Sequence, residues 1–328
     1  MKTTALLATA IDRVEVAEAR IPDPARGQVI IETAYTAISP GTEMRCLAGK
    51  QPGIAFPFIP GYSMVGRIAA RGAGSTLAEG TLVFCQGTEK ANHTLAWGAH
   101  IGHALCAEGR VFPLPVGVDP LAASLVKLGA IAYRGVCVAG TRPHDEVAVV
   151  GLGPIGQLAT RLHRLAGAHV VAADLSSDRV ALARAAGIEA IVPREELTAA
   201  FRPLQPRGAD VVVDATGVPP VLQQTVLLAK SKPWDNSLTE PTRLVIQGSY
   251  AENVVFDYHQ AFFRELSVYF PRDNQARDLQ AVLRFLACGS LKTRDLVSEV
   301  CKPAEAPKIY AALRTGKPGL LTAVFQWR

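Results

Sequence analysis

The glycine-rich segment Gly151-Leu152-Gly153-Pro154-Ile155-Gly156 carries the clearest chemical signal in the chain. It matches the pattern G-x-G-x-x-G, which is informative where a strand precedes it and a helix follows it. Here an apolar run, 147–150, comes directly before the first glycine, and helical spacing begins at Ile155. Glycines permit a tight turn and a close backbone approach, so that a pyrophosphate can lie at the helix N-terminus. The segment therefore predicts a dinucleotide site with contacts from Gly151, Gly153, Pro154, Ile155 and Gly156.

A carboxylate at the end of the next apolar run discriminates between the two nicotinamide dinucleotides. Asp174 follows the run 169–173, 23 residues after Gly151. A carboxylate in this place accepts hydrogen bonds from the adenosine ribose hydroxyls and repels a 2′-phosphate. We therefore expect NAD(H) as the cofactor, while Arg179 keeps NADP(H) open as an alternative. In a second interpretation, Asp174 only caps the helix that follows it.

Short apolar runs that alternate with amphipathic segments must position these residues. Strands buried on both faces are expected at 147–150, 169–173, 190–192, 211–214, 244–247 and 266–270. Helical spacing of apolar residues is found at 155–166, 178–186 and 221–229. Six strands with helices between them make a complete α/β fold of the Rossmann type, with a doubly wound parallel sheet.

The rest of the chain predicts a different architecture. Short strands between Gly and Pro turns are expected in a first β-hairpin and at 28–31, 64–70, 82–84 and 111–114. Helices are expected at 121–137 and 275–287, a surface loop at 231–241, and a last strand up to Phe325. We therefore expect an irregular, mostly β domain over 1–118, the dinucleotide-binding domain over 119–271, and a return to the first domain over 272–328.

Composition argues against several classes of partner. The chain has 328 residues, 49% of them hydrophobic, and a net charge of +5 from scattered basic residues, so no nucleic-acid patch is indicated. No uncharged apolar run is long enough to cross a bilayer. The six cysteines form no C-x-x-C pair, which favours reduced thiols and a cytoplasmic protein. The expected partners are a small-molecule substrate and a second copy of the chain, because an apolar strand at 266–270 invites pairing in a homodimer.

The order of elements and two further motifs resemble the medium-chain dehydrogenase/reductase family along nearly the whole chain. The motifs are Asp214-Ala215-Thr216-Gly217 after the fourth strand and Gln247-Gly248-Ser249 after the fifth. The resemblance implies that Ala215, Thr216, Gly248 and Ser249 line the cofactor. It also implies a GroES-like catalytic domain followed by an inserted Rossmann domain, and an oxidoreductase that uses a nicotinamide cofactor.

Most zinc-dependent members of that family have three zinc ligands: a Cys, a His and, as the third, a Cys or an acidic residue. This chain has other residue types at the three corresponding positions. It has Pro40-Gly41-Thr42-Glu43 at the first place, Gly61-Tyr62-Ser63 at the second and Lys127 at the third. Proline, phenol and ammonium cannot replace the thiolate, imidazole or carboxylate donors that zinc needs. The four clustered cysteines of a structural zinc lobe are missing as well, so we expect no metal.

A narrower resemblance connects the chain with a zinc-lacking branch of the family, the dehydrogenase of bacteriochlorophyll synthesis that oxidises a hydroxyethyl side chain. It rests on the Thr42-Glu43 pair and on Pro60-Gly61-Tyr62. Three further segments agree with the same resemblance: Phe256-Asp257-Tyr258, Phe263-Arg264-Glu265 and Trp327-Arg328. We carry over the zinc-free chemistry and not the pigment substrate, because the dinucleotide fold is fuller here than that branch implies.

Tyr62 and Lys127 are the candidate catalytic residues, because side chains at lost ligand positions should project toward one point. Without a metal, a protein group has to take the hydroxyl proton as hydride leaves the carbon. A nearby ammonium favours the phenolate form of a tyrosine, which makes Tyr62 a candidate acid/base. Glu43 is a competing base and Thr42 a candidate relay. In the alternative interpretation, Tyr62 only fills the vacated space and Lys127 pairs with Glu43 as a structural bridge.

His100 and Tyr250 are weaker candidates for contact with the substrate. His93, His100 and His103 lie close together in the sequence, but no Cys or carboxylate completes a metal site among them. The leading function is therefore NAD-dependent interconversion of a secondary alcohol and a ketone without zinc. Two alternatives stay open: reduction of an activated C=C bond in an enone or quinone, and a non-catalytic dinucleotide-binding protein.

Overall fold

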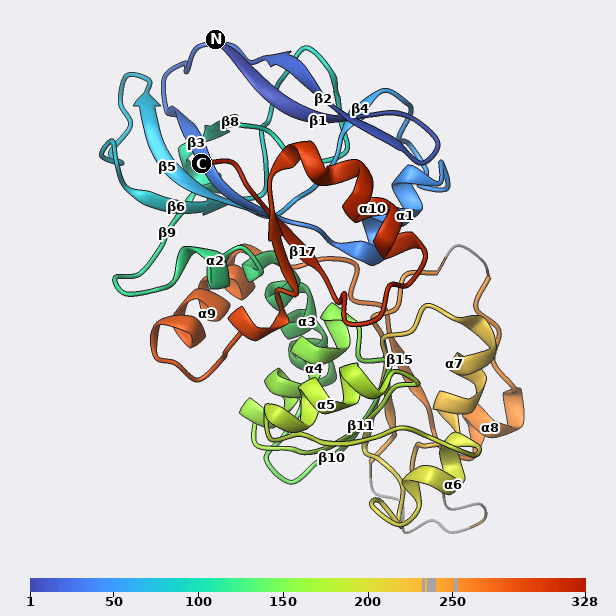
Figure 1. Ribbon diagram of the computed structural model, residues 1–328. Helices are drawn as coiled ribbons and strands as arrows, with labels where there is room; N and C mark the ends of the chain where they lie inside the picture. Colours follow the sequence, from blue (N-terminus) through green and yellow to red (C-terminus); the bar gives the residue numbers. More distant parts are fainter. Residues whose placement is uncertain (232–233, 235–239, 251–252) are drawn as a thin grey trace. The chain divides into compact units, whose positions relative to one another are not determined.

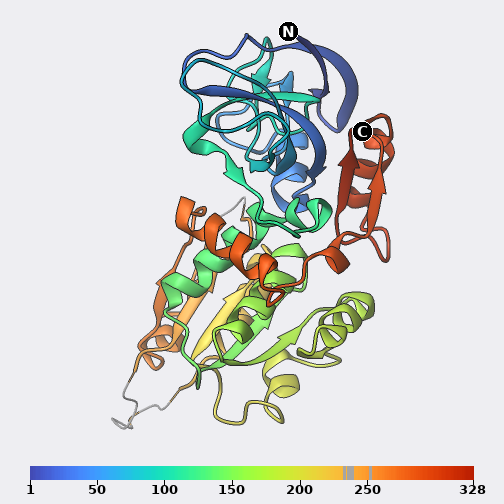
Figure 2. The same cartoon turned by 90° about the vertical axis from the view of Figure 1, so that its left-hand side faces the viewer.

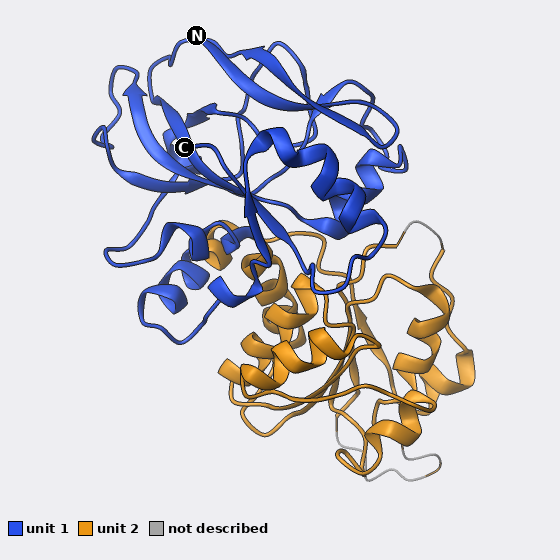
Figure 3. Cartoon of the chain, viewed as in Figure 1, with its two compact units in different colours: residues 1–127, 280–328 blue, residues 128–279 orange. Residues whose placement is uncertain are grey.

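The computed structural model describes residues 1–231, 234, 240–250 and 253–328 of the chain. They divide into two compact units (Figure 3). Unit 1 comprises Met1–Lys127 and Gln280–Arg328, and unit 2 comprises Leu128–Leu279. Most of the surface loop predicted at 231–241 falls outside the described residues. Among the helices that are described, none combines the length and the hydropathy that crossing a bilayer requires.

Unit 2 is built on a six-stranded sheet with the order β12-β11-β10-β13-β14-β15. All of its pairings are parallel, and helices cover both faces of the sheet (Figure 2). The chain begins at β10 in the middle of the sheet, adds strands outward on one side as far as β12, and then adds β13 to β15 on the other side of β10. This strand order is the Rossmann topology, so the predicted fold class is confirmed. The strands are β10 (Glu146–Val150), β11 (His169–Ala173), β12 (Glu189–Ile191), β13 (Val211–Asp214), β14 (Arg243–Ile246) and β15 (Ser267–Tyr269).

The central strands of this sheet are buried on both faces. The residues of β10 from Val147 to Val149 and those of β13 from Val211 to Val213 are fully buried, which explains their continuously apolar sequences. β15 is the last strand in the order and has one neighbour among the described strands, β14. The homodimer that the sequence suggests through this strand stays a prediction.

The helices α4, α5 and α7 of unit 2 begin close to where the sequence predicts them, whereas α6 and α8 are not predicted by the sequence. Proline at the first turn of α4 and of α7 suits a helix start, since the missing N–H would be unpaired there in any case. The helix predicted at 121–137 is broken in two, because Ser124 ends the first part by donating its hydroxyl to the carbonyl of Leu121 at 2.7 Å. The helices are α2 (Pro120–Ala123), which belongs to unit 1, α3 (Val126–Ala139), α4 (Pro154–Leu165), α5 (Ser177–Ala185), α6 (Leu197–Phe201), α7 (Pro219–Val226), α8 (Tyr258–Phe262) and α9 (Ala276–Ala287), which passes into unit 1 at Gln280.

Unit 1 contains a seven-stranded and a four-stranded sheet (Figure 1). The larger follows the order β16-β17-β3-β5-β6-β9 with β8 paired to β3, and the smaller follows β2-β1-β4-β7. β17 pairs with β3 through Val324 opposite Ala37, so the end of the chain completes a sheet begun near its start. The strands are β1 (Lys2–Ala10), β2 (Arg13–Arg20), β3 (Gln28–Ala37), β4 (Phe58–Ile59), β5 (Met64–Arg71), β6 (Leu82–Cys85), β7 (Thr94–Leu95), β8 (His103–Ala107), β9 (Phe112–Pro113), β16 (Glu299–Cys301) and β17 (Ala323–Gln326).

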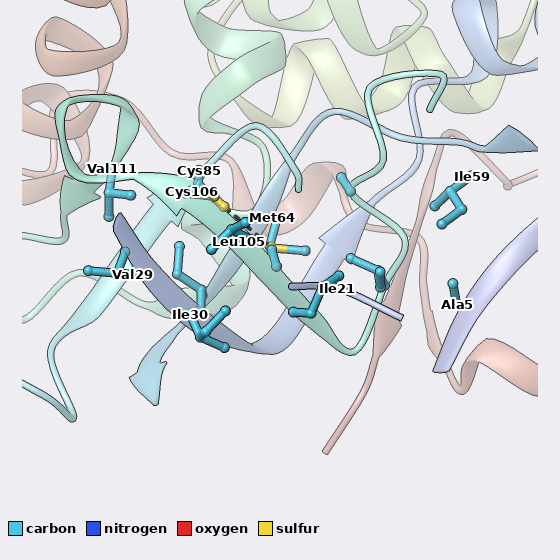
Figure 4. Packing of buried hydrophobic residues seen from close by; sticks show 14 of the residues in the cluster. Ala5, Ile21, Val29, Ile30, Ile59, Met64, Cys85, Leu105, Cys106 and Val111 are labelled. Atoms are coloured by element: carbon cyan, nitrogen blue, oxygen red, sulfur yellow. Dashed lines mark hydrogen bonds between the residues drawn. The ribbon is translucent and has the colours of Figure 1, made fainter. Parts of the chain in front are cut away.

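Aliphatic and sulfur-containing side chains fill the core between the strands of unit 1 (Figure 4). The thiol of Cys85 donates to the sulfur of Met64 at 3.3 Å, and the thiol of Cys106 donates to the carbonyl of Gly87 at 3.3 Å. All six cysteines of the chain are free thiols. Burial raises the pKa of Cys46 and of Cys301 to about 12, so these two thiols stay protonated at neutral pH.

Two helices of unit 1 are not predicted by the sequence. α1 (Pro40–Leu47) begins with Pro-Gly, a pair with low helix propensity, yet proline is tolerated at the first position. Burial of Cys46 and Leu47 in the core supplies what propensity lacks. α10 (Ala306–Arg314) contributes Ile309 and Tyr310 to the same core.

Candidate functional site

The glycine loop between β10 and α4 meets three different geometric requirements. Gly151 has φ +92°, a conformation that favours glycine. A Cβ on Gly156 would lie 1.8 Å from the carbonyl oxygen of Gly151, so only glycine lets the helix approach the loop so closely. A Cβ on Gly153, the N-cap of α4, would meet no described atom within 4 Å. Open space at a helix N-terminus suits an anion.

Asp174 closes this loop from the end of β11. Its carboxylate accepts hydrogen bonds from the backbone N–H of Leu152 at 2.6 Å and of Ser176 at 2.8 Å. The guanidinium of Arg179 lies 3.5 Å from the same carboxylate and is 40% exposed. The N-cap of α5 is Ser176, so Asp174 is not needed to cap that helix.

The loops after β13 and β14 pack against the glycine loop and against each other. A Cβ on Gly151 would lie 2.9 Å from Cγ2 of Thr216 and 3.0 Å from the carbonyl carbon of Ala215. A Cβ on Gly248 would lie 2.3 Å from the backbone nitrogen of Gly217, whose own Cβ would meet the carbonyl oxygen of Ser249 at 2.7 Å. The structure therefore brings these loop residues together at the carboxyl ends of β10, β13 and β14.

Tyr250 is held by a buried carboxylate in the same unit. Its hydroxyl donates to Oδ2 of Asp214 at 2.5 Å, and Thr216 donates to Oδ1 at 2.7 Å. Burial raises the pKa of Asp214, against the opposing effect of these two hydrogen bonds. Burial and the neighbouring carboxylate raise the pKa of Tyr250 well above its ordinary value. Tyr250 therefore stays protonated and ties the two loops together, and its contact with a substrate stays a prediction.

These loops of unit 2 suit a dinucleotide. The carboxyl ends of β10 and β13 border the point where the strand order reverses, which is where open α/β sheets bind ligands. The N-terminus of α4 would hold the pyrophosphate over the open side of Gly153. Asp174 and Arg179 would meet the adenosine ribose, the carboxylate by accepting hydrogen bonds from its hydroxyls.

In unit 1, three hydroxyl groups meet at the N-terminus of α1. The phenol of Tyr62 donates a hydrogen bond to Oγ of Ser39, and its oxygen lies 3.2 Å from Oγ1 of Thr42. Ser39 is the N-cap of α1 and Thr42 belongs to the first turn. We call Tyr62, Ser39 and Thr42 the hydroxyl cluster.

Lys127 lies over the ring of Tyr62, with its Nζ 5.7 Å from the ring centroid. This distance is within the range of a cation–π interaction. The same ammonium donates to Oε1 of Gln86 at 2.6 Å, just beyond the end of β6. Trp97 meets Tyr62 edge to face, with ring centroids 5.2 Å apart. Tyr62 and Lys127, which the family resemblance aligns with two zinc-ligand positions, are therefore adjacent in space, as the sequence predicts.

The backbone around Tyr62 is locked from both sides. A Cβ on Gly61 would lie 2.6 Å from the ring of His100, and Gly61 has φ +90°, so the position requires glycine. On the other side, the hydroxyl of Ser63 donates to the carbonyl of Ser124 at 2.5 Å. Tyr62 is 6% exposed and Lys127 is 4% exposed, and a water-poor environment strengthens the electrostatic interactions between them.

Glu43 is buried in the interior of unit 1 and contacts the backbone of Ser39, one member of this hydroxyl cluster. Its Oε1 accepts a hydrogen bond from the backbone N–H of Ser39 at 2.7 Å. Its Oε2 accepts from the hydroxyl of Tyr310 at 2.6 Å and lies 3.0 Å from Nε2 of His100. Burial and this carboxylate raise the pKa of Tyr310 far above its ordinary value. A carboxylate that is 1% exposed and has these three contacts holds the backbone of Ser39 in place, and the role of Glu43 as a base stays a prediction.

His100, expected to face the substrate, is instead fully buried. Its Nδ1 lies 2.7 Å from Oγ1 of Thr36, opposite the contact of Nε2 with Glu43. The two histidines that lie near His100 in the sequence have other partners. His93 forms a hydrogen bond with the carbonyl of Glu18, and His103 forms one with the hydroxyl of Thr3. Among the described residues, no group of three or more His, Cys, Asp or Glu side chains could hold a metal ion.

Sequence reasoning misses four residues that contact Tyr62 directly or are connected to it through one or two other residues. Ser39 and Gln86 are common polar residues in segments without a motif, and Tyr310 comes from the far end of the chain. Trp97 is the exception, since a tryptophan between small residues in Leu95-Ala96-Trp97-Gly98 is a signal that the sequence offers.

Two family models match the chain, and together they cover both units. The model described as the alcohol dehydrogenase GroES-like domain matches residues 25–116, and the model described as zinc-binding dehydrogenase matches residues 154–287. Both bear out the resemblance that the loop motifs suggest.

Whole-chain comparisons agree with these matches. The chain is 25% identical to a 2-desacetyl-2-hydroxyethyl bacteriochlorophyllide A dehydrogenase of Cereibacter sphaeroides, covering 100% of this chain and 99% of the relative. It is 24% identical to a sorbitol dehydrogenase of Halalkalibacterium halodurans, covering 90% and 91% of the two chains. An Escherichia coli alcohol dehydrogenase crystallised with NADH has the same fold, with a TM-score of 0.85, 19% identity and 99% coverage of both chains. The chain belongs to the medium-chain dehydrogenase/reductase family of zinc-type alcohol dehydrogenase-like oxidoreductases.

Proposed function

We propose that the protein is a zinc-independent, NAD-dependent oxidoreductase that interconverts a secondary alcohol and its ketone. The observation that carries this proposal is the hydroxyl cluster, in which the phenol of Tyr62 meets Ser39 and Thr42 beside the ammonium of Lys127. Tyr62 and Lys127 stand where the family resemblance implies zinc ligands. In this proposal, Tyr62 takes the role that the metal has in zinc-dependent members, because it exchanges a proton with the hydroxyl of the substrate.

The chemistry divides between the two units. A nicotinamide dinucleotide held by the loops of unit 2 would supply the hydride chemistry, to or from the carbinol carbon. Tyr62 takes the hydroxyl proton during oxidation and gives it back during reduction. A positioned acid–base group of this kind is worth roughly 10²–10⁴ in rate.

Four features of unit 1 favour the phenolate that this role requires. The hydroxyls of Ser39 and Thr42 can both turn to donate to a phenolate oxygen, and hydrogen bonds to the charged form stabilise it. The N-terminus of α1 carries partial positive charge, and Ser39 stands at its N-cap position. Lys127 adds a full positive charge over the ring, held in place by Gln86. Each feature stabilises negative charge at Tyr62.

The contacts of Asp174 support NAD(H) as the cofactor. Backbone N–H groups on both sides hold its carboxylate against the glycine loop, where it would accept hydrogen bonds from ribose hydroxyls. The NADH complex of the Escherichia coli structure agrees with a nicotinamide cofactor in this fold. Arg179 beside Asp174 is the residue that would admit NADP(H) if the carboxylate were lost.

The names of the relatives support an alcohol as substrate. One relative is named for a hydroxyethyl side chain and the other for sorbitol, and both align with nearly the whole of this chain. We extend to this protein the class of reaction, oxidation of a carbinol on a small organic molecule, and not either substrate.

A panel of carbonyl compounds tests this proposal. The purified enzyme should oxidise NADH with simple ketones, should contain no stoichiometric zinc by elemental analysis, and should keep its activity after treatment with a chelator. Turnover of enones and quinones without turnover of ketones would replace the proposal with C=C reduction. A full equivalent of tightly bound zinc, or loss of activity to the chelator, would overturn the metal-free mechanism. Binding of NADH without turnover of any member of the panel would indicate a non-catalytic protein.

A further inference from the structure

A cavity of about 390 Å³ opens in unit 1, and its lining includes one residue that contacts Tyr62 and one that contacts Lys127. Its walls include Ile54, Gln86, Thr88, Leu95, Trp97 and Arg110. Gln86 is the residue that holds Lys127, and Trp97 is the residue that packs edge to face on Tyr62. The size is in the range of pockets for small organic ligands, roughly 300–1,000 Å³. A ligand in this cavity would therefore contact two neighbours of the proposed acid/base.

Trp97 has an unusual backbone and an unusual exposure for so large an apolar side chain. Its φ is +68°, in the left-handed region that residues other than glycine rarely adopt, and it is 42% exposed. Strained residues of this kind persist only where the surroundings fix them, and they concentrate at functional sites. The strain and the exposure together point to a role for Trp97 beyond filling the core.

The surroundings of Trp97 do fix it. The backbone N–H of Ala96 donates to the carbonyl of Ile59 at 2.9 Å, and that of Ala99 donates to the carbonyl of Gly61 at 2.8 Å. The segment that carries Trp97 is thereby bonded on both sides to the segment that carries Tyr62. On its other flank, a Cβ on Gly87 would lie 2.5 Å from the carbonyl oxygen of Trp97, so the two loops are in contact. The indole therefore lies at a constant position relative to the phenol.

We propose that this cavity binds a flat, conjugated ring of the substrate, packed against the indole of Trp97, with the carbinol or ketone attached directly to that ring. Pro52, Ile54 and Leu95 supply the apolar walls that such a ring needs. An aromatic or conjugated ring gains from offset or edge-to-face packing on an indole beyond the area that it buries. The inference rests on the proposed function, because it takes Tyr62 to mark the reacting carbon.

Two ketones of similar size and different ring chemistry test the proposal: acetophenone, whose ring is aromatic, and cyclohexyl methyl ketone, whose ring is saturated. The enzymes to compare are wild type, Trp97→Leu and Trp97→Phe, with Trp234→Leu as the matched control because Trp234 belongs to unit 2. Both replacements at 97 keep a side chain on the same left-handed residue, so the backbone strain is common to them. Thermal unfolding and NADH binding check that each variant is folded.

Trp97→Leu should lower kcat/KM for acetophenone by about tenfold, mainly through KM, and that for cyclohexyl methyl ketone by less than about threefold. Trp97→Phe should recover most of the loss, and Trp234→Leu should have no effect on either ketone. Calorimetric binding of acetophenone should weaken in Trp97→Leu in parallel, which gives a readout that does not depend on turnover.

The outcomes separate the two proposals. If wild type reduces both ketones and Trp97→Leu affects them equally or not at all, the ring site is overturned and the proposed function stands. If no ketone is reduced but acetophenone binds to wild type and more weakly to Trp97→Leu, the ring site stands and the proposed function fails. A wild-type enzyme that neither binds nor reduces acetophenone overturns the ring site.

Discussion

In unit 2, six consecutive residues that run from the end of β10 into the first turn of α4 make most of the proposed cofactor loop, and a regular parallel sheet positions the rest. In unit 1, the hydroxyl cluster and its neighbours come from five separate segments: the start of α1, the turn before β5, the end of β6, the loop after β7 and the start of α3. The first site uses backbone groups, and the second uses side chains. A backbone site tolerates variation in sequence as long as the glycines stay, whereas a side-chain site depends on each residue type.

The contrast has a consequence for substitutions. Each substitution in the cofactor loop should lower the affinity for the dinucleotide only moderately, because many backbone N–H groups contact the same ligand. Substitutions in unit 1 should lower turnover strongly at the reacting group and weakly at residues that only support it. The four predictions below test this division, from the largest effect to the smallest.

Tyr62→Phe removes the phenol and should lower turnover of a ketone by roughly 10²–10⁴, the usual contribution of a general acid–base group. NADH affinity should stay near wild type, since its contacts are expected in unit 2. Steady-state kinetics and NADH fluorescence titration measure the two quantities. If Tyr62→Phe leaves turnover nearly unchanged, the phenol has only a packing role, and unit 1 does not contain the proposed reacting group.

Lys127→Met removes the ammonium over the ring and should lower turnover by about tenfold, because the phenolate loses the stabilisation of a nearby positive charge. During ketone reduction Tyr62 acts as the protonated donor, so the alkaline limb of the pH–rate profile should move to higher pH. During alcohol oxidation it acts as the base, so the acidic limb should move to higher pH as well. If the pH–rate profile shifts neither for ketone reduction nor for alcohol oxidation, Lys127 has no role in favouring the phenolate.

The double variant Tyr62→Phe with Lys127→Met gives the control for this pair. Its cost should be much less than the product of the single effects, because residues that act as one unit are non-additive. Lys127→Arg, which keeps the charge, should lose less than Lys127→Met. Fully multiplicative effects would mean that the two residues act independently.

Asp174→Ala should narrow the preference for NADH over NADPH by about tenfold, since a hydrogen bond to a charged group contributes about 1.5–3 kcal/mol. The matched control is Arg179→Ala, which should weaken NADPH more than NADH. Dissociation constants for both dinucleotides decide the matter. A wild type that prefers NADPH by tenfold would show that Asp174 does not select the ribose.

Glu43→Gln should change turnover by only a few-fold, because the carboxylate faces Ser39, Tyr310 and His100 inside unit 1. It should instead lower the free energy of unfolding by about 1–3 kcal/mol, the cost of disturbing a buried hydrogen-bonded group. Denaturant unfolding and kinetics of the same preparation separate the two effects. Loss of turnover at full stability, together with a silent Tyr62→Phe, would make Glu43 the base.

The sequence predicts unit 2 more closely than unit 1 for a physical reason. A strand buried on both faces needs a continuous apolar run, and a helix against a sheet needs apolar residues at helical spacing, so both leave local patterns. α1 leaves none, because Pro40 and Gly41 indicate a turn while burial of Leu47 in the core makes the helix. Long-range packing overrides local propensity there.

By itself, the sequence determined the glycine loop, the place of Asp174 and the unusual residues at Tyr62 and Lys127, because each depends on a residue type at a short spacing. Only the tertiary structure decided what surrounds Tyr62. It placed Glu43 against Ser39, Tyr310 and His100, and it packed the ring of His100 against Gly61. It also brought Ser39 and Trp97 to the phenol, and Gln86 to Lys127, from distant segments. No local pattern encodes such contacts, since residues far apart in the chain meet only when the strands of unit 1 pair and its core closes.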